Sequence, residues 1–395
     1  MKIKTFFLSI IATLLTSPLY AMNDCVKHIA DHHDQHAFLE LDSCQLQDQD
    51  MPGVAAYLTS HPEIFQVELN KNNIGSEGAR ILANASTAAV IDLDDNHIGP
   101  EGAVALANNT HLKLLSAANN YIQTGGALAL ANSTTLQHIN VANNDIEDAG
   151  IVALANMPAL NWLGIAENHL GKAGIAALIH NAHIGMIDVS YTQANISDLL
   201  AFVTTRQTLY GLGVSGLHLG DANMKLLIDN IHADEMYEFM IADNDVTAAS
   251  IAGIAAWNNL VILDVAHNHL GDSGMALLAS SKTTLFANLY ASENDISDEG
   301  AKMMAESIPY IVYTDLRYNR IGSVGREALD ASKRIGHADL SFNLYDTNDA
   351  LGINKNPIDS SRTRLGDHPS FAVVTARCAA HMNKGCFNAV YHLKN

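Results

Sequence analysis

Apolar and polar positions along the chain repeat about every 24 residues. In the clearest copies, apolar residues lie five and three positions before an asparagine, another lies two positions after it, and a glycine lies six after it. Five of these asparagines are evenly spaced: Asn72, Asn96, Asn120, Asn144 and Asn168. A repeat of this length predicts a solenoid, in which each coil covers the apolar face of the next coil.

The two halves of the repeat predict a short strand followed by a short helix. The apolar pair before the asparagine has a spacing of two, so both side chains point to the same face of a strand. The segments 77–83, 101–107 and 299–305 each begin with an acidic residue and are rich in glycine and alanine. An acid suits the N-terminal dipole of a helix, and small residues let the helix pack closely on the strands.

The recurring asparagine is predicted to be buried where the chain leaves the strand. Its amide can both donate hydrogen bonds to backbone groups and accept hydrogen bonds from them. Stacking the coils would repeat this arrangement along the molecule. Alanine at this position would leave buried groups unpaired, at a cost of roughly 1–3 kcal/mol per site.

This frame resembles the leucine-rich repeat, L-x-x-L-x-L-x-x-N/C-x-L. The register extends upstream to Cys44, since the family allows cysteine at the asparagine position, and downstream to Thr192, Leu217, Asn244, Asn268, Asn294, Asn319 and Asn343. The helical half is similar to the ribonuclease-inhibitor-like class. The resemblance implies an α/β solenoid of thirteen repeats over residues 38–351, curved as a horseshoe with parallel strands on the concave face and short helices on the convex face.

The repeats around Thr192 and Leu217 break the pattern. Both lack the asparagine, and four glycines gather in one coil: Gly211, Gly213, Gly216 and Gly220. Glycine in a strand can mark a bend or the close approach of a ligand to the backbone, and it also weakens a strand. A bend, a ligand site and a degenerate repeat are therefore all compatible with this segment.

The two ends of the chain do not follow the repeat. Residues 1–21 combine Lys2 and Lys4 with a short apolar run, which predicts a secretory signal peptide too short to span a membrane. Residues 22–37 and 352–395 are expected to cap the solenoid. No later stretch is long and apolar enough to cross a bilayer, so we expect an exported protein, secreted or periplasmic. Similar proteins of bacteria that live on or in eukaryotic hosts engage host factors, so the resemblance also suggests a host partner.

The four cysteines all lie near the ends of the chain. In an exported protein they predict disulfides that hold the caps. Cys378 and Cys386 enclose a turn signal and could form one bridge. A Cys25–Cys44 bridge is the other candidate, although Cys44 is equally explained as the buried residue that replaces asparagine.

The net charge and the absence of catalytic motifs disfavour several classes of function. The chain has a net charge of −20, which disfavours binding to nucleic acid or to an anionic membrane and favours a basic partner. It lacks a nucleophile elbow and a glycine-rich phosphate loop with lysine, so we expect neither an enzyme nor a cofactor. On a helix, His28, His32 and His36 would share one face and could hold Zn²⁺ or Cu²⁺. An extracytoplasmic metal-binding protein is thus the alternative function, and a solvated histidine-rich cap is the alternative reading of the cluster.

The concave face is the leading candidate for binding. Side chains that alternate with the buried strand residues point outward, and here they are acidic and aromatic. Aromatic and arginine residues within a charged field are typical of interface hot spots, although any outward position of an acidic protein tends to carry acids. We expect Trp162, Tyr290 and Tyr313 to be exposed, and we expect this face to bind a basic protein or peptide. The candidate residues are Asp92, Trp162, Asp188, Met240, Asp264, Tyr290, Tyr313, Asp315, Arg317 and Asp339. Tyr191, Tyr318 and Phe342 lie on the same side, one position before the asparagine position.

Overall fold

The computed structural model describes residues 38–181, 183–206, 208–283 and 285–344. These residues divide into two compact units, the N-terminal unit up to residue 184 and the C-terminal unit from residue 185. The expected signal peptide, both caps, the histidine cluster at 28–36 and the Cys378–Cys386 bridge lie outside the described residues. Cys25 does too, so its bridge to Cys44 stays a prediction.

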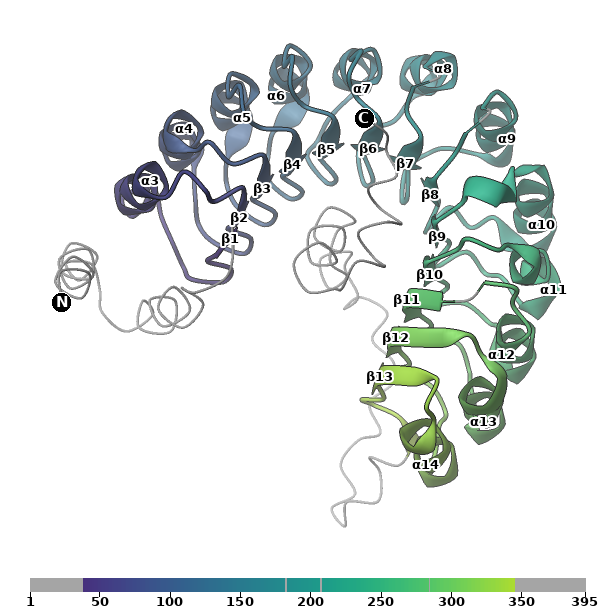
Figure 1. Cartoon of the computed structure of the whole chain (residues 1–395). Coiled ribbons are helices and arrows are strands. Elements are labelled where there is room, and N and C mark those ends of the chain that lie inside the picture. The colour runs from purple at the N-terminus through teal and green to yellow at the C-terminus, as the bar shows by residue number, and fades with distance from the viewer. Residues whose placement is uncertain (1–37, 182, 207, 284, 345–395) are drawn as a thin grey trace, which may run out of the picture. The chain divides into compact units, whose positions relative to one another are not determined.

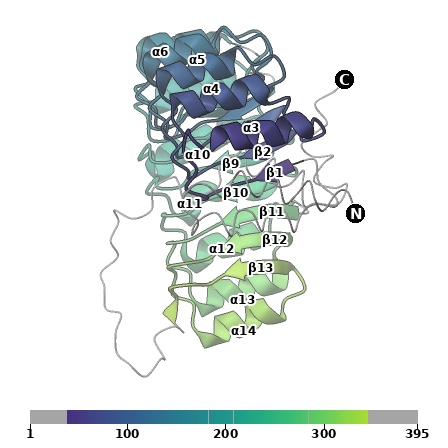
Figure 2. The ribbon, with the colours of Figure 1, turned by 90° about the vertical axis from the view of Figure 1, so that its left-hand side faces the viewer.

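In the N-terminal unit, six short parallel strands alternate with six helices along the chain. The elements are β1 (Phe38–Glu40), α3 (Met51–Ser60), β2 (Gln66–Glu68), α4 (Ser76–Ala85), β3 (Val90–Asp92), α5 (Gly99–Ala107), β4 (Leu114–Ser116), α6 (Gln123–Leu130), β5 (His138–Asn140), α7 (Asp148–Ala155), β6 (Trp162–Gly164) and α8 (Lys172–His180). The strands lie on one side of the unit and the helices on the other (Figure 1). Figure 2 shows α3, α4, α5 and α6 side by side in chain order.

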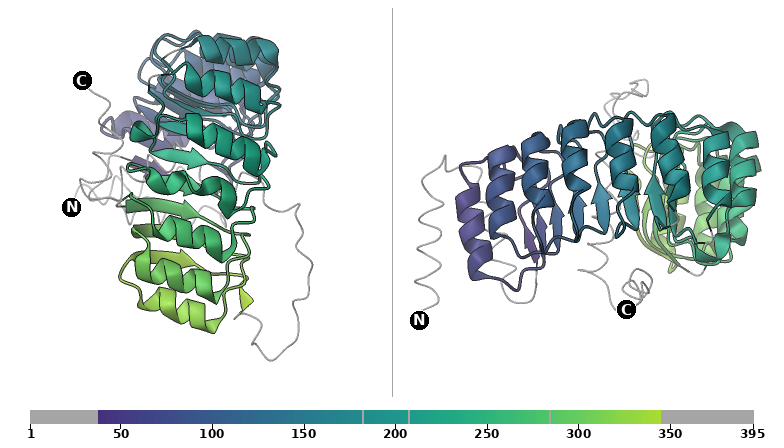
Figure 3. Two further views of the ribbon diagram at one scale, coloured as in Figure 1. Left: turned by 90° about the vertical axis from the view of Figure 1, so that its right-hand side faces the viewer. Right: turned by 90° about the horizontal axis from the view of Figure 1, so that it is seen from above.

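The C-terminal unit repeats this plan with seven strands. Its elements are β7 (Met186–Asp188), α9 (Ile196–Thr204), β8 (Gly211–Gly213), α10 (Gly220–Asn230), η1 (Ala233–Glu235), β9 (Glu238–Met240), α11 (Ala248–Ile251), η2 (Ile254–Ala256), β10 (Ile262–Asp264), α12 (Gly271–Ala279), β11 (Leu285–Tyr290), α13 (Asp298–Ser307), β12 (Tyr310–Asp315), α14 (Ser323–Ala331) and β13 (Ile335–Asp339). Its helices, coloured from teal to yellow-green, lie one above another in the left view of Figure 3. The expected α/β solenoid, with parallel strands and helices in alternation, is confirmed. The horseshoe expected for the whole repeat region stays a prediction.

The apolar frame forms the core between strands and helices. Val67, Leu69 and Ile74, the three apolar positions of one repeat, are fully buried. The glycine six positions after the asparagine is explained by close packing. A Cβ atom on Gly102 would lie only 2.3 Å from Cγ2 of Ile98. The same Cβ atom would lie 3.1 Å from Cβ of Ala79 in α4, so the missing side chain lets neighbouring helices pack closely.

The asparagines are buried and link successive coils, as expected. The Asn96 side chain accepts a hydrogen bond from the Ile74 backbone N–H (2.9 Å) and donates to the carbonyl oxygens of Leu69 and Leu93 (both 3.0 Å). It thereby joins its own coil to the preceding one. Ten asparagines are buried at this position and form the asparagine ladder: Asn72, Asn96, Asn120, Asn144, Asn168, Asn244, Asn268, Asn294, Asn319 and Asn343.

The residue before each ladder asparagine adopts a left-handed backbone conformation. Lys71, Tyr318 and Phe342, for example, have φ angles of 55°, 55° and 61°. The conformation lets the backbone N–H of this residue reach the next coil, as where Tyr318 donates to the Ser341 carbonyl (3.2 Å). The turn after each strand is therefore fixed by contacts between coils.

Aspartates connect the helical side of neighbouring coils in a similar way. Oδ1 of Asp298, the first residue of α13, accepts hydrogen bonds from the backbone N–H groups of Gly322 (2.6 Å) and Gly325 (2.8 Å) at the start of α14. Asp148 does the same for Gly171 and Gly174. These acids thus also bind N–H groups of the following helix, a role that the sequence did not reveal.

Candidate binding surface on the strands of the C-terminal unit

Two rows of side chains lie on the face of β7–β13 that is opposite to the buried strand residues. They occupy the last position of each strand and the position two residues before it, and strand pairing sets them in register. The first row takes the last position of each strand and consists of Asp188, Gly213, Met240, Asp264, Tyr290, Asp315 and Asp339. The second row consists of Met186, Gly211, Glu238, Ile262, Asn288, Tyr313 and His337.

These strands are strongly biased in charge. They contain five acidic residues and no lysine or arginine. The acids are Asp188, Glu238, Asp264, Asp315 and Asp339. The surface formed by the two rows therefore carries a concentrated negative potential.

The aspartates of the first row share one local hydrogen bond. Oδ1 of Asp188, Asp264 and Asp339 accepts from the backbone N–H two residues later, at 2.9, 2.9 and 3.0 Å. In the N-terminal unit, Asn140 makes the same bond to Ala142 with a neutral amide (3.2 Å). The bond requires an oxygen and not a charge, so it does not explain why the C-terminal unit uses aspartate.

A group of three carboxylates occupies the first half of this surface. Burial, together with the nearby Asp188 and Asp264 carboxylates, raises the pKa of Glu238 well above its usual value. Burial and Asp264 also raise the pKa of Asp188. Oε2 of Glu238 is buried and has no hydrogen-bond partner among the described residues. The three carboxylates repel one another, and a cation placed among them would relieve that repulsion.

The glycines of β8 make room for the side chains of this group. A Cβ atom on Gly213 would lie 2.3 Å from Oδ1 of Asp188, and one on Gly211 would lie 2.6 Å from Cε of Met186. Neighbouring side chains therefore lean over the glycine strand. Serines bridge the same coils where the ladder asparagine is missing, since Ser190 Oγ accepts from the Ser215 N–H (2.9 Å) and Ser215 Oγ from the Ala242 N–H (3.1 Å).

Arg317 lies at the other end of the surface and is engaged by acids of its own unit. Its guanidinium donates to both carboxylate oxygens of Asp315 (3.0 and 2.8 Å) and lies 3.7 Å from Asp339. The hydrogen bond to Asp315 raises the pKa of Arg317. Arg317 therefore orients Asp315 and offsets part of the negative charge.

His267, which is not among the candidate residues predicted from the sequence, lies beside an acid of the same unit. Nδ1 of His267 lies 3.3 Å from Oε2 of Glu293, at the left-handed positions of adjacent coils. The hydrogen bond to Glu293, and more weakly the negative charges of Asp243 and Asp264, raise the pKa of His267. The signal was present in the sequence, because His267 and Glu293 both directly precede a ladder asparagine.

The expected exposure of the large aromatic side chains is wrong for Trp162 and Tyr290. Only 4% and 8% of their surfaces are accessible. The Trp162 ring folds over Gly164 of its own strand, where a Cβ atom would lie 3.2 Å from the ring. The Tyr290 ring packs beside Tyr313 with a centroid distance of 6.0 Å. Tyr313 is half-buried and also stacks on His337 of β13 (5.7 Å).

Exposed aromatic surface occurs instead at the left-handed positions. Tyr318 and Phe342 are 39% and 56% exposed, and their rings stack in parallel with centroids 4.5 Å apart. Both residues lie outside the set of candidate binding residues predicted from the sequence. Strand alternation alone does not show which outward aromatic residues lie against their neighbours.

The ten candidate residues are thus divided between the two units and between two levels of burial. Asp92 on β3 and Trp162 on β6 lie in the N-terminal unit, and the other eight lie in the C-terminal unit. Half of the ten are buried: Asp92, Trp162, Asp264, Tyr290 and Asp315. The half-buried ones are Asp188, Met240, Tyr313, Arg317 and Asp339. The second group is therefore the accessible part of the candidate surface.

A family model and one solved structure agree with the fold. Residues 90–107, 132–155, 258–279 and 292–305 match the family model described as Leucine Rich repeat. No curated protein matches the sequence. The solved structure of a Rad7 and Elc1 complex in yeast is similar, with 14% identity over 75% of this chain and 83% of that chain and a TM-score of 0.53. An internalin (inlF) from Listeria monocytogenes matches at 17% identity over 85% and 94% of the two chains, with a TM-score of 0.40.

Four segments of the chain thus match leucine-rich repeats, and the described residues have the fold of a leucine-rich-repeat solenoid. Repeats of this kind suggest a module for protein–protein interaction. In the part of the chain that the structure describes, no helix has the length and apolar character needed to span a membrane.

Proposed function

We propose that the protein binds a basic segment of another protein or peptide on the strand face of the C-terminal unit. The observation that carries this proposal is the presence of five acids and no lysine or arginine on β7–β13. The local hydrogen bond of the first row does not account for these charges, because an amide satisfies it equally well. A cationic partner accounts for them.

Two parts of the surface would contribute differently. Lysine or arginine side chains of the partner would lie near Asp188, Glu238 and Asp264, where mutual repulsion favours an incoming cation. At the other end, Tyr318 and Phe342 would supply an exposed aromatic contact beside Arg317 and Asp339. Aromatic anchors in a charged surround are typical of binding hot spots, and the negative field would speed association.

We further propose, from the sequence alone, that the protein is of the exported bacterial type and that its partner is a host factor. The N-terminal run of residues 1–21 supports export, and the terminal cysteines support disulfides in an oxidising compartment.

Capture experiments with a matched pair of variants test the binding proposal. The row variant combines Asp188→Asn, Asp264→Asn and Asp339→Asn, and each asparagine keeps the oxygen that accepts the backbone N–H. The helix-side control combines Asp234→Asn, Glu306→Gln and Glu327→Gln, three exposed acids of the same unit, and removes the same charge. Proteins captured from a host-cell extract would be identified by mass spectrometry, and their affinities would then be measured with purified components.

We expect wild-type protein and the helix-side control to bind the same basic partner, with an affinity that falls as salt increases. The row variant should bind it at least about tenfold more weakly, which corresponds to about 1.4 kcal/mol. Equal binding by the row variant and the control would refute the assignment of this face.

A further inference from the structure

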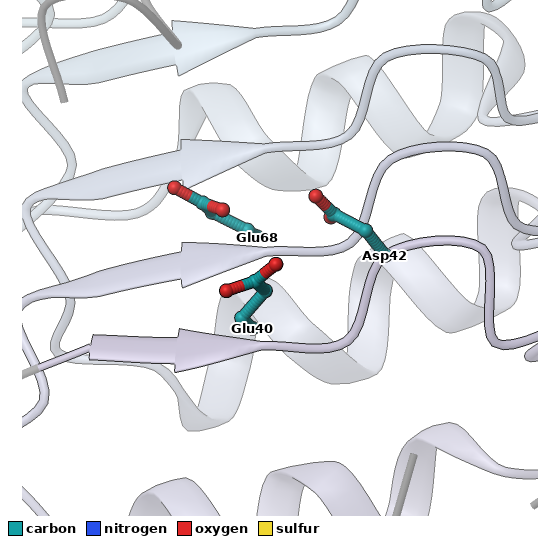
Figure 4. Close-up of side chains that lie close together, drawn as sticks. All are labelled: Glu40, Asp42 and Glu68. Carbon is teal, nitrogen blue, oxygen red and sulfur yellow. The ribbon is translucent and has the colours of Figure 1, made fainter. Parts of the chain in front are cut away.

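Three carboxylates meet in the first two coils of the N-terminal unit. Glu40 ends β1, Asp42 lies just after it, and Glu68 ends β2. Each offers an oxygen atom, and the three oxygens lie within 4.8 Å of one another. Figure 4 shows the side chains of Glu40 and Glu68 on neighbouring strands, with Asp42 beside them. This cluster is separate from the surface described above, because all of it belongs to the N-terminal unit.

Strand register extends the cluster to a fourth acid. Glu40 pairs with Glu68, and Glu68 pairs with Asp92 of β3. Neighbouring strands lie about 4.8 Å apart, so three carboxylates form a row across adjacent strands. Like charges at this spacing raise each other's free energy, and a cation shared among them would lower it.

Two buried oxygen atoms give independent evidence for a ligand. Gln66 and Asp92 are only 1% and 3% exposed. The Gln66 amide donates to Oε1 of Glu68 (2.7 Å), but Oε1 of Gln66 has no donor among the described residues. Oδ2 of Asp92 also lacks one. Strand pairing places Asp92 directly beside Glu68, at the same level of the neighbouring strand.

We propose that this cluster is a binding site for a calcium ion. Glu40, Asp42 and Glu68 would supply the first three ligands, and the unpaired oxygens of Asp92 and Gln66 would complete the protein's part of the shell. Every donor is an oxygen, which suits a hard cation, and calcium accepts about six to eight such ligands in flexible geometry. Magnesium demands a stricter octahedron and keeps more of its water. The bound ion would join the first three strands and offset their repulsion.

Calcium titration of the purified full-length protein, after treatment with a chelator, tests the proposal. We expect isothermal calorimetry to show one saturable site and CaCl2 to raise the unfolding temperature more than MgCl2 does. Extracellular calcium modules bind with dissociation constants as weak as about 1 mM. An unfolding temperature unchanged by calcium at about 10 mM, tenfold above that limit, would overturn the proposal.

Two pairs of substitutions test whether Glu40 and Glu68 form the calcium site. Glu40→Gln with Glu68→Gln should abolish the calcium-dependent rise. In the absence of calcium, this variant should be at least as stable as the wild type, because the amides remove like-charge repulsion. Loss of the response would therefore not reflect misfolding. Glu306→Gln with Glu327→Gln removes two exposed acids from the helices of the C-terminal unit and should leave the response intact. A response that survives the first pair, or that disappears equally with the second, would refute the assignment.

Discussion

At the scale of single residues, the chain uses polar side chains in two opposite ways. The ladder asparagines are buried with their donors and acceptors paired, as where Asn144 accepts from the backbone N–H groups of Asn120 (3.0 Å) and Ile122 (2.9 Å). Glu238 and Asp92 are buried as well, but one oxygen of each lacks a partner among the described residues. Paired groups hold the fold together, whereas unpaired carboxylates oppose it and mark places where a cation would bind.

Glu238→Gln should stabilise the free protein at neutral pH. Burial raises the pKa of Glu238 above its ordinary value of 4.5, so the folded state binds this proton more tightly than the unfolded state does. The favourable contribution is therefore complete below about pH 4.5 and is lost as the pH rises through the higher folded pKa. Glutamine stays neutral at every pH and does not suffer this loss.

The measurement is the unfolding temperature of both proteins between pH 4 and pH 8. The variant should gain a few degrees at pH 7, since 1 kcal/mol corresponds to about 2–4 °C for domains of this size. The gain should shrink toward pH 4. Glu306→Gln, an exposed change on α13, should show no such trend. A gain that does not depend on pH would contradict the explanation by ionisation.

At the scale of secondary-structure elements, the periodicity of the sequence predicted the strand and the helix within each coil. The expected helical segments at 77–83, 101–107 and 299–305 lie within α4, α5 and α13. Periodicity did not predict contacts between coils, such as Asp298 at the start of α14 or the serine bridge from Ser190 to Ser215. These bonds join residues about one repeat apart, so no local pattern reveals them.

The same limit applies to the candidate binding surface. Its acidic character could be read from alternation along the strands. The burial of Trp162 depends on the neighbouring Gly164, and that of Tyr290 depends on the packing of Tyr313 from the next strand. Exposure of an outward side chain is thus decided by its neighbours as well as by its position in the repeat.

Tyr318→Asn should separate partner binding from stability in the turn that follows β12. Tyr318 has a φ angle of 55°, a conformation that bulky residues rarely adopt and that asparagine tolerates well. We therefore expect the unfolding temperature to stay the same or to rise slightly. Binding of the captured partner should weaken by roughly 1–2 kcal/mol, because the variant removes an exposed aromatic anchor.

Tyr121→Asn provides the matched control for this turn. Tyr121 is also an exposed tyrosine with a left-handed backbone (φ 56°), but it belongs to the N-terminal unit. The two variants should have similar stabilities, and only Tyr318→Asn should reduce binding. If both reduce binding equally, Tyr318 is not part of a localised binding surface.

At the scale of the whole molecule, a net charge of −20 lowers the stability of the folded protein but favours the binding of a basic partner. The acids repel one another in the folded protein, and the same charges attract a basic partner. Both effects are electrostatic, so added salt should weaken both. The Debye length falls from about 10 Å at 0.1 M salt to about 3 Å at 1 M.

Raising NaCl from 0.1 M to 1 M should therefore raise the unfolding temperature of the free protein while lowering its affinity for the captured partner. The row variant (Asp188→Asn, Asp264→Asn, Asp339→Asn) should already be more stable at low salt and should gain less from added salt. The helix-side control loses the same charge from exposed positions, where solvent already screens it, and should keep more of the gain. Differential scanning fluorimetry and calorimetric binding titrations at both salt concentrations give the two readouts. Equal gains for the two variants would show that the acids on the strands are no more mutually repulsive than acids elsewhere, and the electrostatic basis of the proposed binding would then be lost.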